Sequence, residues 1–181
     1  MALSQERLAQ IRELSNGERV DRTDVSDFTD SDWERFHTDL DAETLAFCRE
    51  NKDPEELHAF ADTWNWDAGF GALQDILDNP VCEAATALLI YWKGAPEFYR
   101  QFCDRDSVAA AKADVENFDF LTGIETRYVA GGFSPGRLSF DPSRPEDCGG
   151  HRYVGTYDDM KDAFVRELPA VMYAPVVGRA E

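Results

Sequence analysis

Apolar residues recur at helical spacing from the start of the chain. Leu8, Ile11 and Leu14 are three positions apart, which places them on one face of an α-helix. A serine suited to the N-cap precedes them, and Asn16 and Gly17, a frequent helix end, follow them. The pattern predicts a first amphipathic helix over residues 4–15.

The segment DRTDVSDFTDSDWERF contains the start of a second predicted helix. Thr29 is a suitable N-cap, and Phe28 and Trp33 have the spacing of a hydrophobic staple across it. Ser31 with Glu34 forms an alternative capping box two residues later.

The same segment contains an aspartate at every third position. An EF-hand loop has oxygen ligands at every second position and a central glycine, so a calcium site is not expected. The second helix is predicted to run to about Leu40. A separate start at Asp41 or Thr44 is predicted to continue to about Asn51.

The rest of the chain also reads as short helices. The periodicity predicts them over residues 54–63, 82–92, 107–116, 118–130 and 157–168, with one more across Phe70, Leu73 and Ile76 and another that begins at Pro96. Asp53 and Pro54 favour the first of these starts, and Asn65 or Asp67 caps the helix at Phe70. The run at 82–92 is apolar almost all round, so it predicts the central buried helix.

Helices that follow one another closely, with little strand signal, predict an all-α fold: a compact bundle of short antiparallel helices. Residues 131–150 are rich in glycine and proline and predict a loop, with at most a minor strand near 138–140. We expect an acidic helical region over 1–53, a helical core over 54–140, and a loop and helix over 141–181 that pack on the core within one compact domain.

The net charge of −18 narrows the range of partners. It repels phosphate backbones and anionic membranes and favours basic proteins, so no nucleic-acid or membrane partner is expected. The N-terminal residues lack the apolar core of a secretory signal, and no stretch is long and apolar enough to span a membrane. A cytoplasmic location is the expectation.

Catalytic and metal-binding patterns are absent from the sequence. The histidines and cysteines lack the spacing of a metal site, so neither a metal nor a cofactor is expected. No nucleophile motif is present, and acidic pairs such as Asp158 and Asp159 arise by chance among 36 acidic residues. The GGFSPG segment at 131–136 resembles an anion cradle only loosely and is interpreted as a connecting loop.

Aromatic and acidic residues alternate in the first part of the chain, which is how an interface for a basic protein could be built. We expect aspartates there to steer association and Trp33 or Phe36 to act as an anchor. The predicted partner-binding residues are Asp21, Asp24, Asp27, Asp30, Asp32, Trp33, Phe36, Asp39 and Asp41.

Residues 57–99 resemble a bacterial family of unknown function. The family carries an L-H-x-x-A…N-W-D-x-G-F motif, then I-x-x-[NH]-P-x-C and T-A-L-x-x-[FY]-[WY] segments. The likeness weakens toward Phe140, and it leaves out most of the first 50 residues and the last 35. The residues that match the first motif are Leu57, His58, Ala61, Asn65, Trp66, Asp67, Gly69 and Phe70. The candidate site residues of this segment are His58, Trp64, Asn65, Trp66, Asp67 and Gly69.

These motif residues are interpreted as structural: Asn65 or Asp67 as a cap, Trp66 as a filler between helices, and Gly69 as a point of close helix approach. A binding role for the Trp64–Asp67 edge is the alternative. The resemblance implies an immunity or accessory role, because members of the family are often encountered near secreted-toxin systems.

Three functions follow as hypotheses. The first is a non-enzymatic intracellular binding protein, an immunity protein that covers the active site of a basic toxin. The second is an enzyme of unrecognised type that uses His58 or His151 with a nearby carboxylate. The third is a helical adaptor without a toxin link.

Overall fold

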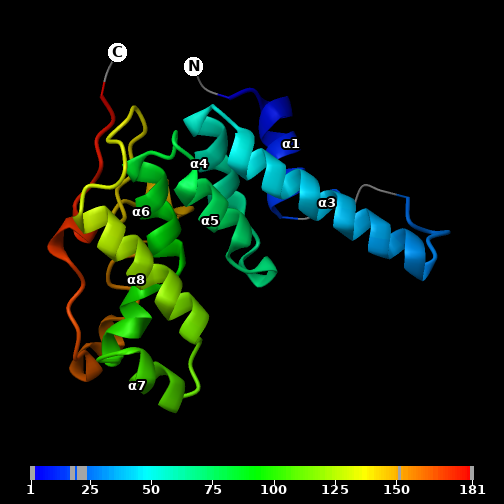
Figure 1. The fold of residues 1–181 in the computed structure, drawn as a ribbon. Coiled ribbons are helices and arrows are strands. Elements are labelled where there is room, and N and C mark those ends of the chain that lie inside the picture. The colour runs from blue at the N-terminus through cyan, green and yellow to red at the C-terminus, as the bar shows by residue number, and fades with distance from the viewer. Residues whose placement is uncertain (1–2, 17–18, 20–23, 151, 180–181) are drawn as a thin grey trace. The chain divides into compact units, whose positions relative to one another are not determined.

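The computed structural model describes residues 3–16, 19, 24–150 and 152–179. Helices account for the regular structure of these residues, apart from isolated β-bridges, so the all-α prediction is confirmed. The chain divides into two compact units, Met1–Cys82 (unit 1) and Glu83–Glu181 (unit 2), both drawn in Figure 1. The boundary between the units lies inside the predicted core of 54–140. None of the described helices is both long and apolar enough to cross a membrane.

Unit 1 contains four described α-helices. They are α1 (Gln5–Ser15), α3 (Asp30–Glu50), α4 (Pro54–Thr63) and α5 (Gly71–Asp78). Helix α1 packs on α4, and α3 packs on α5. The core between them is formed by fully buried side chains that include Ile11, Leu57, Phe60 and Ile76.

Helix α3 begins where the sequence predicts but does not break. The Thr29 hydroxyl accepts a hydrogen bond from the Asp32 N–H (3.3 Å), and the Asp32 carboxylate accepts one from the Thr29 N–H (3.0 Å). Ser31 therefore lies inside the helix, and the alternative start is wrong. The predicted break near Asp41 is also wrong: no glycine or proline interrupts the helix, and the packed face at Thr44 continues the face that precedes it.

The segment between α4 and α5 differs from the prediction. Asn65 caps only a short 3₁₀-helix, Trp66–Ala68, by accepting a hydrogen bond from the Asp67 N–H (3.1 Å). Gly69 then adopts φ +80°, a conformation that favours glycine, and α5 begins at Gly71 without a side-chain cap. A Cβ atom on Gly69 would meet nothing within 4 Å, so the predicted close helix approach is wrong.

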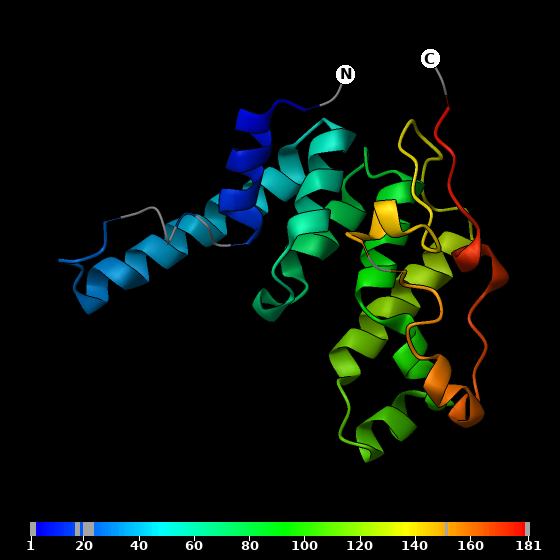
Figure 2. The same ribbon diagram turned by 180° about the vertical axis from the view of Figure 1, so that it is seen from behind.

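Unit 2 is built around α6 (Ala84–Lys93), whose residues 85–92 are all buried, as predicted for the central helix. It also contains α7 (Arg105–Ala110), α8 (Val115–Val129) and 3₁₀-helices at Pro96–Gln101, Pro145–Cys148, Asp158–Ala163 and Ala170–Tyr173. Helix α6 packs on α8, and α8 on α7. Figure 2 shows these helices from behind.

Unit 2 contains a largely buried polar cluster formed by Tyr91, Glu125 and Arg166. The Tyr91 hydroxyl donates a hydrogen bond to the Glu125 carboxylate (2.7 Å), and Glu125 also pairs with Arg166. Burial, together with the neighbouring carboxylate, raises the pKa of Tyr91 far above its usual value. Tyr91 therefore stays protonated and serves as a donor.

The predicted final helix over 157–168 is wrong. Only a short 3₁₀-helix forms, and the chain then becomes extended. The backbone N–H groups of Val165 and Arg166 donate to the Arg100 carbonyl oxygen at 2.8 and 3.0 Å, so this segment bonds to a distant residue instead of to its own previous turn.

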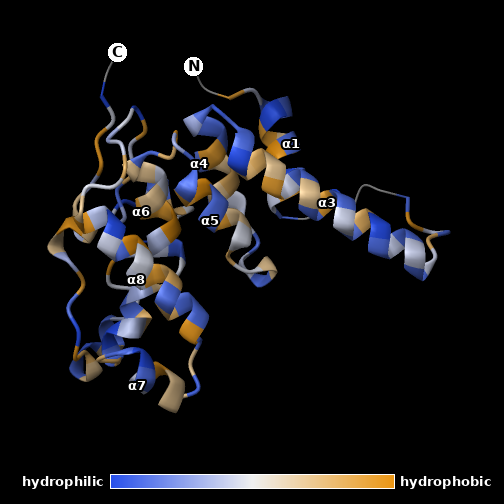
Figure 3. Cartoon of the chain, viewed as in Figure 1, coloured by the Kyte–Doolittle hydropathy of each residue, from blue (hydrophilic) through white to orange (hydrophobic). Residues whose placement is uncertain are grey.

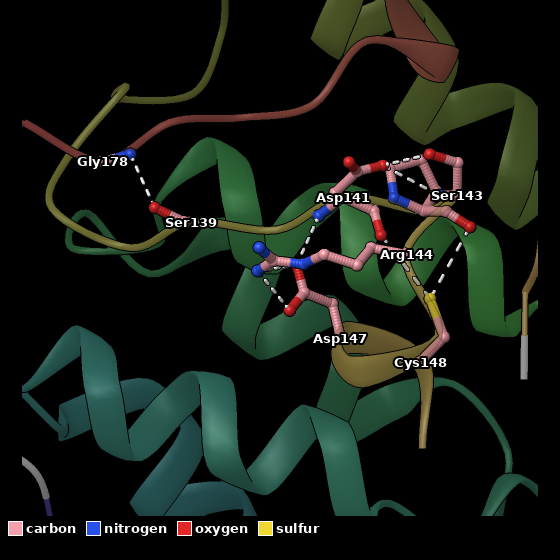
Figure 4. A network of polar contacts seen from close by, with 8 residues as sticks. Ser139, Asp141, Ser143, Arg144, Asp147, Cys148 and Gly178 are labelled. Carbon is pink, nitrogen blue, oxygen red and sulfur yellow. Dashed lines mark hydrogen bonds and ion pairs between the residues drawn. The ribbon is translucent and has the colours of Figure 1, made fainter. Parts of the chain in front are cut away.

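The predicted loop at 131–150 is held by local polar contacts, shown in Figure 4. The Asp141 N–H donates to the Asp147 carboxylate (2.9 Å), which also pairs with Arg144 (2.7 Å). Phe140 forms an isolated antiparallel bridge with Val176, the only trace of the minor strand expected near 138–140 within the described part of unit 2.

Candidate functional site

Negative charge is concentrated in unit 1. This unit contains 20 acidic and 7 basic residues, whereas unit 2 contains 16 and 11. The excess is greatest around the start of α3, where residues 24–43 include eight acidic residues and Arg35 as the single basic one. The first half of α3 is mostly hydrophilic in Figure 3 for this reason.

One face of α3 continues beyond the part that is packed. Trp33, His37, Leu40, Thr44 and Cys48 are three or four residues apart, so they share a helix face. Thr44 and Cys48 are buried in unit 1. The N-terminal half of the helix extends beyond α1, α4 and α5, as Figures 1 and 2 show.

Aromatic rings gather on this extended half. The Trp33 ring lies 5.2 Å from the Phe28 ring, 6.1 Å from the Phe36 ring and 5.5 Å from the stacked His37 ring, between centroids. The Phe28–Trp33 contact confirms the predicted staple. We call the set Trp33, Phe36, His37 and Leu40 the apolar stripe; His37 is exposed and the other three are half-buried.

Two rows of acidic side chains border the apolar stripe. By helical spacing, the rows consist of Asp30, Glu34 and Asp41 on one side and of Asp32, Asp39 and Glu43 on the other. All are exposed except Asp32, which is half-buried.

Local hydrogen bonds lower the pKa of several acidic side chains in and before α3. The Thr29 hydroxyl and N–H hold the pKa of Asp32 below its usual value, and the Ser26 N–H does the same for the pKa of Asp24. Arg19 lowers the pKa of Glu43 through a hydrogen-bonded ion pair. Glu43 therefore has a cationic partner inside the chain and contributes less to the negative surface.

A cleft of about 210 Å³ lies beside the inner end of the apolar stripe. It brings Asp41 of α3 together with Trp64 of the motif segment. The Trp64 ring is fixed, because its N–H donates to the Gly69 carbonyl oxygen (2.9 Å) and the ring stacks on Phe60. The lining residues are Asp41, Thr44, Leu45, Trp64, Ala68, Gly71 and Ala72.

The other predicted site residues are more scattered. Asp27 is exposed before α3, and Asp21 lies outside the described residues. Of the motif residues, His58 and Trp66 are half-buried and Asp67 is exposed. The Trp66 ring meets the Phe70 ring edge-on at 5.9 Å.

Sequence reasoning missed His37 and Leu40 as members of this surface. The signal was present in the three- and four-residue spacing from Trp33 to Cys48. The predicted break near Asp41 concealed this signal, because it placed the packed part and the extended part of one face in two different helices.

The described residues contain no group of three or more His, Cys, Asp or Glu side chains that could hold a metal ion. His151 lies outside them, and the cleft at Trp64 has no histidine in its lining. Burial raises the pKa of Cys48 to about 12, so this thiol is a poor nucleophile.

The GGFSPG segment binds an anion from its own chain. The N–H groups of Arg137 and Leu138, which directly follow the segment, donate to the buried Glu83 carboxylate at 2.8 and 2.7 Å. Gly136 adopts φ +47°, and a Cβ atom there would lie 1.9 Å from the Glu83 Cδ. Glu83 therefore occupies the N–H groups that follow the segment and the space beside Gly136.

Residues 52–129 match the model of a protein family described as a domain of unknown function (DUF4274). The matched segment includes α4 to α8 and the tryptophan-containing motif, and it leaves out all of α3. No curated protein and no solved structure matches the chain.

Proposed function

We propose that the protein is a non-enzymatic binding protein that inhibits a basic bacterial toxin by placing the extended half of α3 in the toxin's active cleft. The observation that supports this proposal is the apolar stripe bordered by two acidic rows on a part of α3 that extends beyond α1, α4 and α5. The resemblance to a family often encountered near secreted-toxin systems supplies the immunity role.

The arrangement suits a partner with an apolar floor and basic walls. Acidic rows on both sides of the helix attract a cleft lined with lysine and arginine and raise the rate of encounter. Trp33 and Phe36 supply the large rings that usually contribute most of the binding energy once water is excluded. The acidic side chains thus select a basic partner, and the rings contribute most of the binding energy.

The first test changes the acidic rows. The partner is isolated by affinity capture from the protein's own cell lysate at low salt and eluted at high salt. Its association rate is then measured with the variant Asp30→Lys, Asp39→Lys, Asp41→Lys. We expect association to slow at least about tenfold and its salt dependence to flatten, because the steering charges are reversed.

The matched control is Glu146→Lys, Asp159→Lys, Asp162→Lys, which makes the same charge change at exposed positions in unit 2. We expect this variant to retain most of the association rate. Equal slowing by both variants would show that net charge alone drives the encounter and would exclude α3 as the docking face.

The second test concerns the anchor. Trp33→Ala or Phe36→Ala is expected to raise the dissociation rate roughly 30-fold, which corresponds to about 2 kcal/mol. Val129→Ala, at a valine that is 59% exposed on α8, is the control and should have no effect. Unaltered dissociation in both ring variants would remove the anchor from the proposal.

An adaptor without a toxin link would use the same surface, so binding alone does not separate the two roles. The activity of the captured protein separates the two roles. Stoichiometric loss of that activity on addition of the inhibitor supports the immunity role, whereas a bound partner with unchanged activity indicates an adaptor.

A further inference from the structure

A buried carboxylate in unit 2 has no cationic partner among the described residues. Glu97 is 4% exposed. Both of its oxygens accept hydrogen bonds from the Gly155 N–H at 3.0 Å, and one accepts a longer bond from the Tyr157 N–H at 3.4 Å. None of the ion pairs of the described chain includes Glu97. The hydrogen bonds to this carboxylate thus come from backbone N–H groups of the described residues.

Glu97 lines a cleft of about 190 Å³ together with three aromatic residues. Trp92, Tyr153 and Tyr157 contribute rings to it, and Lys93 is the one cationic residue in the lining. The Trp92 ring is held in place because its N–H donates to the Met172 carbonyl oxygen (2.7 Å). The cleft thus combines a positioned tryptophan and two tyrosines with a buried carboxylate.

The backbone beside the cleft is strained. Ala95, another lining residue, has φ +57° and ψ +54°, the left-handed conformation, which is unfavourable for a residue other than glycine. This turn joins α6 to the 3₁₀-helix that contains Glu97. Strained residues of this kind cluster at binding sites, where the surrounding structure maintains them.

We propose that this cleft binds a small organic cation, an alkylammonium or guanidinium group. A buried carboxylate is favourable only when it is well compensated, and a carboxylate has about four lone-pair sites, so Glu97 can accept further donors from a ligand. Aromatic faces attract cations within about 6 Å of the ring. The volume is below the roughly 300 Å³ of pockets for whole drug-sized molecules, so the cleft takes a head group.

Lys93 allows the charge of the ligand to be tested. Its ammonium group opposes a cationic ligand, so its removal should strengthen binding. A ligand that carried a carboxylate or phosphate would use Lys93 as its partner, and its binding should weaken when Lys93 is replaced.

The experiment titrates the full-length protein with four probes of similar size: n-butylammonium, n-butylguanidinium, neutral n-pentanol and anionic pentanoate. NMR follows the Trp92 indole N–H and the Gly155 and Tyr157 amides. We expect saturable shifts with the two cations and none with the other two probes. Stronger binding of pentanoate or pentanol than of the cations would overturn the proposal.

Variants then connect binding to Glu97. Glu97→Gln keeps an oxygen for the Gly155 N–H but removes the charge, and we expect the dissociation constants of the cations to rise at least about tenfold. Glu116→Gln, at an exposed acid on α8, is the matched control and should leave them unchanged. Binding to Glu97→Gln that equals wild type would show that Glu97 only anchors the loop at Gly155.

Lys93→Met provides an independent test of cation binding if Glu97→Gln does not fold. We expect cation binding to tighten several-fold in Lys93→Met, and unchanged or weaker binding would overturn the proposal. The α3 variants lie in unit 1 and should not affect this titration. Either proposal can therefore be contradicted while the other stands.

Discussion

The side-chain amide of Asn79 joins the ends of two helices in unit 1. Its Nδ2 lies 2.9 Å from the Cys48 carbonyl oxygen, 3.1 Å from that of Arg49 and 3.0 Å from that of Asn51. Its Oδ1 accepts a hydrogen bond from the Val81 N–H (3.1 Å). These carbonyl groups at the end of α3 have no partners within the helix, so Asn79 supplies a donor for them; the bond to Cys48 is buried and the other two are part-buried.

Asn79→Ala should therefore destabilise the protein strongly for a single polar substitution. Asn79 is 3% exposed, and the loss of one buried partner leaves several carbonyl groups unsatisfied, so we expect a decrease of about 2 kcal/mol in the free energy of unfolding. Urea denaturation at neutral pH measures it. Asn65→Ala, at an exposed cap, is the control and should cost less than 1 kcal/mol.

A decrease in the Asn79→Ala variant no larger than that of the control would contradict this role. It would mean that water reaches the end of α3 and replaces the amide at little cost.

At the scale of elements, α3 combines two functions in one helix. Its C-terminal half packs on α5, and its N-terminal half presents the apolar stripe. The capping box at Thr29 stabilises the extended end locally. At 21 residues the helix is about 30 Å long, so its packed half can hold the other half clear of α1, α4 and α5.

The contact between α1 and α4 includes an ion pair with a predictable pH dependence. The Arg7 Nε donates to Glu56 at 2.6 Å, and the Asn51 amide donates to Glu56 at 2.7 Å. The Arg7 hydrogen bond, helped by Asn51, holds the pKa of Glu56 below its usual value. The Glu56 side chain is 15% exposed, so solvent screens the pair only in part.

Because the folded-state pKa of Glu56 lies below its unfolded-state value, its contribution is present above the unfolded pKa and is lost as the pH falls through the folded pKa. We expect Glu56→Gln to lower the free energy of unfolding by about 1 kcal/mol at pH 7. The difference from wild type should shrink as the pH approaches 3. Urea denaturation of both proteins at several pH values measures it.

Glu50→Gln, at an exposed position on the last turn of α3, should show little difference at any of these pH values. A constant difference between Glu56→Gln and wild type from pH 7 to pH 3 would indicate a packing effect instead of the loss of a charge.

At the scale of the whole molecule, the net charge of −18 opposes folding. The described ion pairs compensate part of it, but unit 1 still has 20 acidic against 7 basic residues. A highly charged chain repels itself more strongly when it is compact than when it is unfolded. The acidic surface proposed for binding therefore has a cost in stability.

Added salt should reduce that cost. Between about 10 mM and 1 M NaCl the Debye length falls from roughly 30 Å to 3 Å, so we expect the thermal midpoint to rise by several degrees at neutral pH. Differential scanning calorimetry measures the midpoint. The variant Asp30→Lys, Asp39→Lys, Asp41→Lys should show a smaller rise, and a midpoint that falls with salt in wild type would exclude net repulsion.

Local signals in the sequence predicted where three helices of unit 1 begin. Ser4, Thr29 and Asp53 accept hydrogen bonds from the first turns of α1, α3 and α4, as their positions indicated. The apolar run at 82–92 predicted the buried helix of unit 2. These features depend on residues that are neighbours along the chain, so no knowledge of the fold was needed.

Predictions that depended on local pattern alone were wrong where distant groups compete for the same backbone. The segment at 157–168 has a helical pattern, but Val165 and Arg166 bond to Arg100. In α3, contact with α5 favours one continuous helix over the predicted break at Asp41. Local preferences differ by only about 1 kcal/mol per residue, so a few tertiary contacts decide between such alternatives.

The sequence by itself determined the all-α class, the helix starts at Ser4, Thr29 and Asp53, and the strong negative charge of the first part of the chain. Only the tertiary structure decided that the acids of α3 border a single stripe and that Glu97 lies beside an aromatic cleft. The reason is physical: caps and periodicity are set within one or two helical turns, whereas a surface or a cleft is made by side chains whose proximity arises from the packing of whole helices.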